Sequence, residues 1–116
     1  MYIFVFQRDN KSTLDQSVMS IMSRDQQRIQ RGENRIINSS YVTLSGLRAW
    51  QEIYYDYANN KSMKALVVMT VKGGEEYQLM FITQPGYFNK YLPIAEKMIK
   101  SFQITKWLRL FRKSDL

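Results

Sequence analysis

Cysteine and histidine are both absent from the 116 residues of this chain. Without cysteine there is no disulfide, no thiolate nucleophile and no cysteine-ligated metal site. Without histidine the chain lacks the side chain that most often serves as a general base or metal ligand near neutral pH. Glu75 and Glu76 alternate across an expected strand and cannot share a substrate, and Gly73-Gly74 opens another strand rather than a phosphate-binding helix. We therefore predict that the chain is not an enzyme and uses no metal or cofactor.

Long apolar runs are also missing, because no stretch approaches the roughly 18 apolar residues that span a bilayer. The composition that is present, 45% hydrophobic and 23% charged, is typical of one globular domain. Lysine and arginine number 17 against 10 acidic residues, and the net charge of +7 suits nucleic acid, anionic lipid or an acidic protein without choosing among them. Residues 1–6 lack the basic start and the small-residue cleavage site of a signal peptide, so the compartment stays open.

The spacing of apolar residues predicts seven elements in the order β-α-β-β-β-β-α. The expected strands are Tyr2–Gln7, Arg35–Val42, Leu47–Tyr57, Lys64–Lys72 and Glu75–Thr83, and the expected helices are Thr13–Arg31 and Phe88–Phe102. Short links between successive strands imply a largely antiparallel sheet with helices packed on it. If Gly73-Gly74 forms a two-residue turn, Val68 faces Leu79 and Leu66 faces Phe81.

Each expected helix has a predicted boundary and a predicted buried side. Ser12 is expected to cap the first helix with Asp15 three residues on, and Gly32 to end it. Its buried side is expected to hold Leu14, Val18, Ile21, Met22 and Ile29, and its wet side Arg24, Gln27, Arg28 and Arg31. The last helix is expected to follow a break at Pro85-Gly86 and to keep Pro93 near its first turn. Its buried stripe is expected to be Tyr91, Ile94, Ala95, Met98, Ile99 and Phe102.

Several segments carry a family resemblance. They are Gly46-Leu47-Arg48-Ala49 with the aromatic strand that follows, Tyr77, and Tyr91-Leu92-Pro93 followed by Met98-Ile99-Lys100-Ser101-Phe102. Over Tyr2–Ile104 the chain resembles the PsbP-like family, whose founding members are extrinsic subunits of photosystem II, and we expect a non-photosynthetic bacterial or archaeal relative. The resemblance implies an α+β fold, an α/β/α sandwich around a central mainly antiparallel sheet, and a binding or accessory role. Family members usually carry an N-terminal segment with an export or lipoprotein signal, which this chain lacks.

The last residues form a distinct segment. Residues 1–104 are assigned to the PsbP-like domain and 105–116 to a basic amphipathic tail. On a helix, Ile104, Trp107, Leu108, Leu110 and Phe111 share one face, and Thr105, Lys106, Arg109, Arg112 and Lys113 the other. Such a helix suits an anionic membrane surface or an acidic groove, through Lys106, Trp107, Arg109, Phe111, Arg112 and Lys113. Docking of the apolar face on the domain itself, or on a second copy, is the favoured alternative.

Two further sets of side chains are candidate binding surfaces. Arg24, Arg28, Arg31 and Arg35 could meet phosphates as a stripe, although Asp25 and Glu33 interrupt it and a solvated face is favoured. Trp50, Tyr54, Tyr55 and Tyr57 could stack bases or line a groove, although a place in the core is favoured.

The chain is therefore interpreted as a non-enzymatic binding or accessory module that acts by protein–protein contact. The contact is expected through the exposed sheet face or edge, with the tail as an auxiliary anchor. A peripheral membrane-surface module is the first alternative, and a weak binder of nucleic-acid backbone is the second and less favoured one. A homodimer in which a second copy completes the sheet stays open. We expect the closing helix to seal the sheet and to leave no polar pocket.

Overall fold

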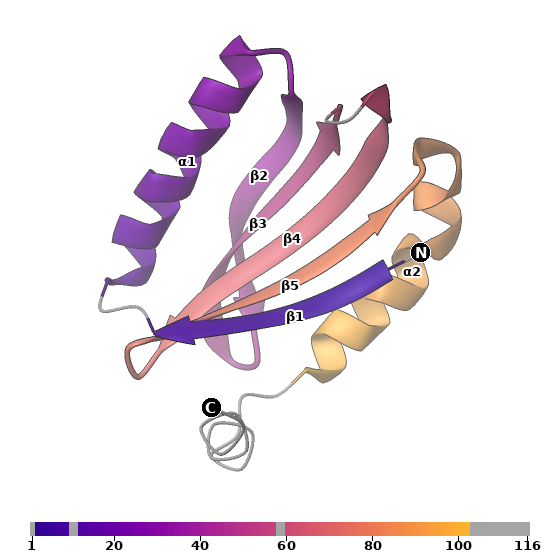
Figure 1. The fold of residues 1–116 in the computed structure, drawn as a ribbon. Helices are drawn as coiled ribbons and strands as arrows, with labels where there is room; N and C mark the ends of the chain where they lie inside the picture. Colours follow the sequence, from indigo (N-terminus) through magenta and orange to yellow (C-terminus); the bar gives the residue numbers. More distant parts are fainter. Residues whose placement is uncertain (1, 10–11, 58–59, 103–116) are drawn as a thin grey trace.

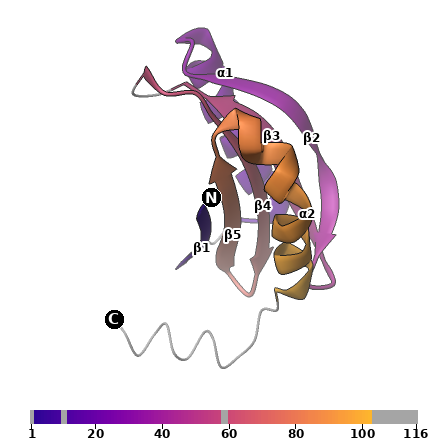
Figure 2. The ribbon, with the colours of Figure 1, turned by 90° about the vertical axis from the view of Figure 1, so that its right-hand side faces the viewer.

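One antiparallel sheet with a helix on each face makes up the fold (Figures 1 and 2). The computed structural model describes residues 2–9, 12–57 and 60–102. Its five strands lie in the order β1-β5-β4-β3-β2. The strands are β1 Tyr2–Asp9, β2 Asn34–Leu44, β3 Leu47–Asp56, β4 Met63–Lys72 and β5 Glu75–Thr83, and the helices are α1 Leu14–Gln30 and α2 Pro85–Ser101. The predicted α+β sandwich and the predicted order of elements are confirmed.

Two tight turns set the register of the sheet. Gly73 and Gly74 adopt φ angles of 59° and 76° between β4 and β5, a conformation that glycine takes without steric cost. As predicted, Val68 then pairs with Leu79 and Leu66 with Phe81. Ser45 and Gly46 form the corresponding turn between β2 and β3, with φ angles of 54° and 75°. Because this turn is only two residues long, β2 runs on to Leu44 rather than ending at Val42.

The core lies between the sheet and α2. It consists of the buried side chains Leu44, Ala49, Leu66, Val68, Leu79 and Phe81 from the sheet, with Phe88, Ala95 and Ile99 from α2. The rings of Phe81 and Phe88 lie 5.4 Å apart between centroids. Burial of each such ring stabilises the fold by about 1.5–3 kcal/mol.

The predicted start and buried stripe of α2 are partly wrong. The helix begins at Pro85 rather than Phe88, because proline at the first helical position gives up an N–H that has no helical partner. Pro93 therefore lies inside the helix and not near its first turn. The longer helix brings Phe88 under the sheet and turns its buried side toward Ala95 and Ile99. Ile94 and Met98, both predicted to be buried, are each 50% exposed.

The predicted orientation of α1 is also partly wrong. Thr13, rather than Ser12, caps the helix through a capping box with Gln16. Val18 is buried as predicted, whereas Met22 and Ile29 are exposed. Asp25 and Arg28 are half-buried on the side that faces the sheet, although Arg28 was placed on the wet side. The reason is that the sheet presents Glu52 and Asp56 to this part of the helix, so polar residues face inward there.

Candidate functional site

A hollow of about 260 Å³ separates the middle of α1 from the sheet. It is lined by Ile21, Arg24, Asp25 and Arg28 of α1, by Trp50, Glu52 and Tyr54 of β3, and by Val67, Met69, Gln78 and Met80 of β4 and β5. The helix packs mainly against β2 and β3, and Figure 1 shows it to one side of the sheet. The side chains of β4 and β5 on this face are therefore only partly covered by α1. The expectation that the domain has no polar pocket is wrong.

Two carboxyl groups meet in this hollow. Glu52 is only 6% exposed, and its Oε1 accepts a hydrogen bond of 3.2 Å from the indole Nε1 of Trp50. Burial, together with the hydrogen bond and negative charge of Asp25, raises the pKa of Glu52 to about 8, against the opposing effects of Trp50 and Arg24. At neutral pH Glu52 is therefore mainly protonated, and it lies across the gap between β3 and α1 from Asp25.

The phenol of Tyr54 forms another part of the wall. Burial, with the negative charge of Asp56, raises the pKa of Tyr54 to about 12. The phenol is thus neutral over the whole range in which the carboxyl groups titrate.

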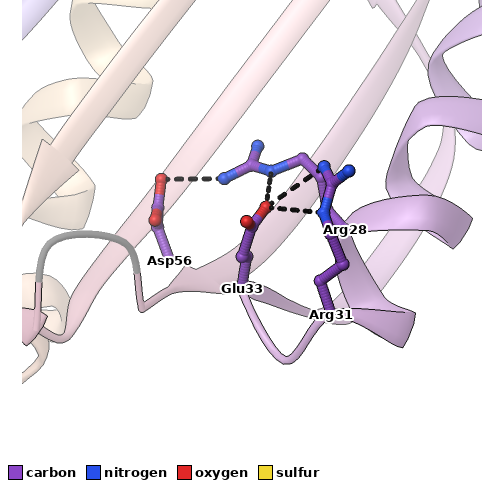
Figure 3. A network of polar contacts seen from close by, with 4 residues as sticks. All are labelled: Arg28, Arg31, Glu33 and Asp56. Carbon is purple, nitrogen blue, oxygen red and sulfur yellow. Dashed lines mark hydrogen bonds and ion pairs between the residues drawn. The ribbon is translucent and has the colours of Figure 1, made fainter.

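An ion-pair network holds the C-terminal end of α1 (Figure 3). Arg28 Nη2 lies 3.3 Å from Asp56 Oδ2, and its Nε lies 4.0 Å from Glu33 Oε2. Arg31 Nη2 approaches the same Glu33 oxygen at 3.2 Å. Figure 3 shows Glu33 between the two guanidinium groups and Asp56 on the far side of Arg28. The network ties the helix to the end of β3.

This network bears on the predicted arginine stripe. Arg28 and Arg31 are paired with carboxylates, and Arg24 borders the hollow. Arg35 lies exposed on β2 and not on the helix. The four arginines are therefore divided among an ion-pair network, a hollow and a strand.

A second polar cluster holds the N-terminal end of α1. The hydroxyl of Tyr41 on β2 donates a hydrogen bond of 2.7 Å to Asp15 Oδ1, and Arg48 Nη1 donates one of 3.0 Å to the same oxygen. The guanidinium carbon of Arg48 lies 3.8 Å from the centroid of the Tyr41 ring. The Tyr41 hydrogen bond, aided by the charge of Arg48, lowers the pKa of Asp15. The helix is thus attached to the sheet at both ends and leaves the hollow between them.

Strand β2 forms one edge of the sheet. Leu44 and Leu47 flank the two-residue turn, and a pair in this position exchanges both hydrogen bonds. Because such pairs alternate along an antiparallel ladder, the N–H and C=O groups of Ser39, Tyr41 and Thr43 point away from β3. No strand among residues 2–9, 12–57 and 60–102 pairs with this outer side of β2.

The side chains of β2 leave this edge open. Residues 37–41 are all exposed, including Ile37 at 46% and Tyr41 at 40%. From Ile36 to Leu44 the strand has no charged residue and no proline. Its only interruption is a shift of register between Ile36 and Asn38. Charged residues, prolines and bulges are the usual protection of sheet edges, and the stretch from Ile36 to Leu44 has only the bulge.

The predicted aromatic set divides between the two faces of the sheet, as expected from its alternation. Trp50 and Tyr54 line the hollow under α1, although Tyr54 is largely buried. Tyr55 lies on the other face and stacks on Tyr57 with ring centroids 6.0 Å apart. Only Trp50 and Tyr54 thus belong to the candidate site.

A second hollow of the same volume lies on the opposite face of the sheet. It is lined in part by Gln51 and Ile53 of β3, and by Leu92, Glu96 and Lys100 of α2. Glu96 and Lys100 are exposed. Because the charged groups of this second hollow remain in water, it is the weaker candidate.

The remaining predicted acidic residues lie elsewhere. Glu75 and Glu76 point to opposite faces, as predicted, and both are buried. Glu75 accepts a hydrogen bond of 2.9 Å from the Tyr77 hydroxyl, and Glu76 accepts one of 2.8 Å from Gln78 Nε2. Among the residues that the structure describes, no group of three or more acidic, histidine or cysteine residues could hold a metal ion. Within the same residues, no helix has the length and apolar character needed to span a bilayer.

The carboxyl pair was missed because the predicted faces of α1 were taken from its apolar residues alone. Asp25 follows Val18 and Ile21 at spacings of seven and four and so continues their face of the helix. Glu52 lies between Trp50 and Tyr54 on one face of a strand. The sequence signal for the site was therefore one acidic residue on the apolar face of a helix and another on the aromatic face of a strand. The predicted tail residues Lys106, Trp107, Arg109, Phe111, Arg112 and Lys113 lie outside the described residues.

Solved structures with a similar fold include the following two. PA94 of Pseudomonas aeruginosa, a protein of unknown function suggested to be a regulator, matches with a TM-score of 0.65 and 9% identity, over 90% of this chain and 83% of its own. CyanoP, the cyanobacterial PsbP of Synechocystis, matches with a TM-score of 0.63 and 12% identity, over 89% of this chain and 66% of its own. No protein-family model matches the sequence, and no curated protein is significantly similar to it. At these identities the likeness establishes the fold alone, and the chain therefore has the PsbP-like fold.

Proposed function

We propose that the protein is a non-enzymatic binding or accessory module that contacts a protein partner through the outer edge of β2. The observation that carries the proposal is the uncharged stretch from Ile36 to Leu44 on an edge strand, whose residues 37–41 are exposed. An extended segment of a partner would add to the sheet beside this stretch.

The backbone supplies the affinity in such a contact. Ser39, Tyr41 and Thr43 offer one donor and one acceptor each toward the partner. Each hydrogen bond that they form contributes about 0.5–1.5 kcal/mol net. The exposed side chains of Ile37 and Tyr41 are available for apolar contacts with the partner.

Two other observations support an accessory role. The inventory of reactive side chains is small, since the chain has neither cysteine nor histidine. PA94, which shares the fold, is suggested to be a regulator. The basic residues of the tail would add an auxiliary contact to an acidic partner.

A photo-crosslinking experiment in cells of the source organism tests the proposal. A benzophenone amino acid replaces Tyr41 on β2 or, as the control, Tyr87 on α2, which is 49% exposed. We expect a discrete cross-linked product from position 41 and none from position 87. The variant Ser39→Pro removes one outward N–H without removing a bond to β3, and it should abolish the product from position 41.

The products also distinguish the kinds of partner. A product twice the mass of the chain would identify a second copy, and any other discrete mass a different protein. Equal patterns from positions 41 and 87, or a product that survives Ser39→Pro, would refute strand addition at β2.

A further inference from the structure

We propose that the hollow under α1 binds a small organic amine, with its ammonium group seated between Glu52 and Asp25 and its apolar body against β3, β4 and β5. This site is separate from the edge of β2, because it lies between Asp25 of α1 and Glu52 of β3. The proposal therefore does not depend on the proposed protein partner.

The shape of the hollow sets the size of the ligand. The Asp15–Tyr41–Arg48 cluster and the Arg28–Asp56 pair hold the two ends of α1 against the sheet. The space between them measures about 260 Å³, and pockets for drug-sized ligands measure roughly 300–1,000 Å³. A compact molecule with one ring or one branched chain is the appropriate class.

The walls favour an apolar body beside the charge. Ile21 of α1 and Trp50 of β3 line the hollow, together with Val67, Met69 and Met80 of β4 and β5. Thioether and indole groups give a polarisable surface on which an aromatic or branched aliphatic group packs well. A lysine side chain of a partner protein would bring only a thin methylene chain to these walls, so a free small molecule fits better.

The polar groups of the hollow favour a cation. Glu52 and Asp25 line the same hollow, and burial together with the nearby Asp25 keeps Glu52 protonated at neutral pH. An ammonium ion in the hollow can replace that proton and pair with the ionised Glu52. It also has three N–H donors, which match the acceptor oxygens of Glu52 and Asp25.

The charged side chains near Glu52 do not take the place of the proposed ammonium group. Arg28 is engaged by Asp56 and Glu33, so its charge is already balanced. Arg24 borders the hollow, and its charge has the smallest effect on the pKa of Glu52 among the groups that alter it. The side chains that β4 and β5 contribute to the lining are not titratable, and the phenol of Tyr54 stays neutral.

Calorimetric titration of the full chain at pH 8 with three probes tests the charge preference. The probes are phenethylamine, 2-phenylethanol and 3-phenylpropionate, which share a ring and differ in the polar group. We expect phenethylamine to bind at least tenfold more tightly than 2-phenylethanol, and 3-phenylpropionate to show no saturable binding. A tripeptide Gly-Lys-Gly should also show none.

Variants test the position of the ammonium group. Glu52→Gln and Asp25→Asn should each weaken phenethylamine binding at least tenfold, whereas Glu96→Gln, an exposed acid of α2, should change it less than twofold. A readout on the unmodified chain is the apparent pKa of Glu52 by NMR, which saturating phenethylamine should lower by at least one unit.

Several results would overturn the proposal. They are equal affinities for the amine and the alcohol, tighter binding of the carboxylate, tripeptide binding as tight as that of phenethylamine, and no saturable binding of any probe. The proposal would also be overturned if Glu52→Gln bound phenethylamine as tightly as the original chain, or if saturating phenethylamine left the pKa of Glu52 unchanged. None of these results bears on cross-linking at Tyr41, so the two proposals fail separately.

Discussion

Replacement of Glu52 by glutamine should make the protein more stable at neutral and alkaline pH. The pKa of this carboxyl rises from 4.5 in the unfolded chain to about 8 in the folded one, because the group is buried beside Asp25. The folded state therefore binds a proton that the unfolded state releases across this range. Its stabilising effect is fully present below pH 4.5 and is lost as the pH rises to 8.

The magnitude follows from the width of that range. Each pH unit in the range costs about 1.4 kcal/mol of unfolding free energy, so the largest total loss is about 5 kcal/mol. Because Glu52 borders a hollow that water can enter, we expect about half of that value. Glutamine keeps the shape of the side chain and has no proton to release, so Glu52→Gln should be about 2–3 kcal/mol more stable than the original chain at pH 8.

Urea unfolding at intervals from pH 4.5 to pH 9 provides the assay, with tryptophan fluorescence as the signal, because Trp50 lies beside the site. We expect the difference in unfolding free energy between Glu52→Gln and the original chain to grow steadily up to pH 8 and then to level off. The exposed Glu96→Gln variant should follow the original chain at every pH. If the Glu52→Gln and original curves ran parallel, the burial and the raised pKa assigned to Glu52 would be wrong.

Three further predictions concern the helices and the tail. Thr13→Ala should lower the urea midpoint by an amount equivalent to about 1 kcal/mol, through loss of the N-cap, and Ser12→Ala by less; the reverse order would contradict the capping assignment. Phe88→Ala should cost about 3–5 kcal/mol of unfolding free energy and Ile94→Ala about 0.5 kcal/mol or less, and equal costs would reject the buried face of α2. In co-sedimentation with anionic liposomes, the intact chain and a version ending at Ile104 should both stay in the supernatant, since about three turns of helix bind lipid weakly. Sedimentation of the intact chain alone would favour the membrane-surface alternative.

The fold was largely predictable from sequence because its strands are joined by short turns. Gly73-Gly74 limits the loop to two residues, and this length determines which residues of β4 and β5 face each other. Alternation of apolar and aromatic residues along β3 then assigns each side chain to one face. Such local rules predict the register of the strands and the facing of their side chains without knowledge of how the helices pack on the sheet.

The orientation of the helices was less predictable, because it depends on contacts between distant segments. The apolar pattern of the sequence predicts that Ile94 is buried. In the structure Phe88 packs against Phe81 instead, and this orientation of α2 leaves Ile94 exposed. In the sequence Asp25 resembles a solvated helix residue. Only the fold shows that Glu52 of β3, which comes much later in the chain, lies opposite it. The candidate site consists of such pairings, so its residues could be recognised only after α1 was placed on the sheet.

The position of β1 in the sheet has a consequence for how the chain reaches its native state. Strands β2 to β5 are consecutive hairpin neighbours and can assemble from nearby contacts, whereas β1 pairs with β5 across nearly the whole intervening sequence, Asp9 opposite Glu75. Closing so long a loop is entropically costly and gains nothing until β5 is in place. We therefore expect the first strand that a ribosome would release to be the last to join the sheet, and the four-stranded meander to form a transient intermediate whose open side is β5.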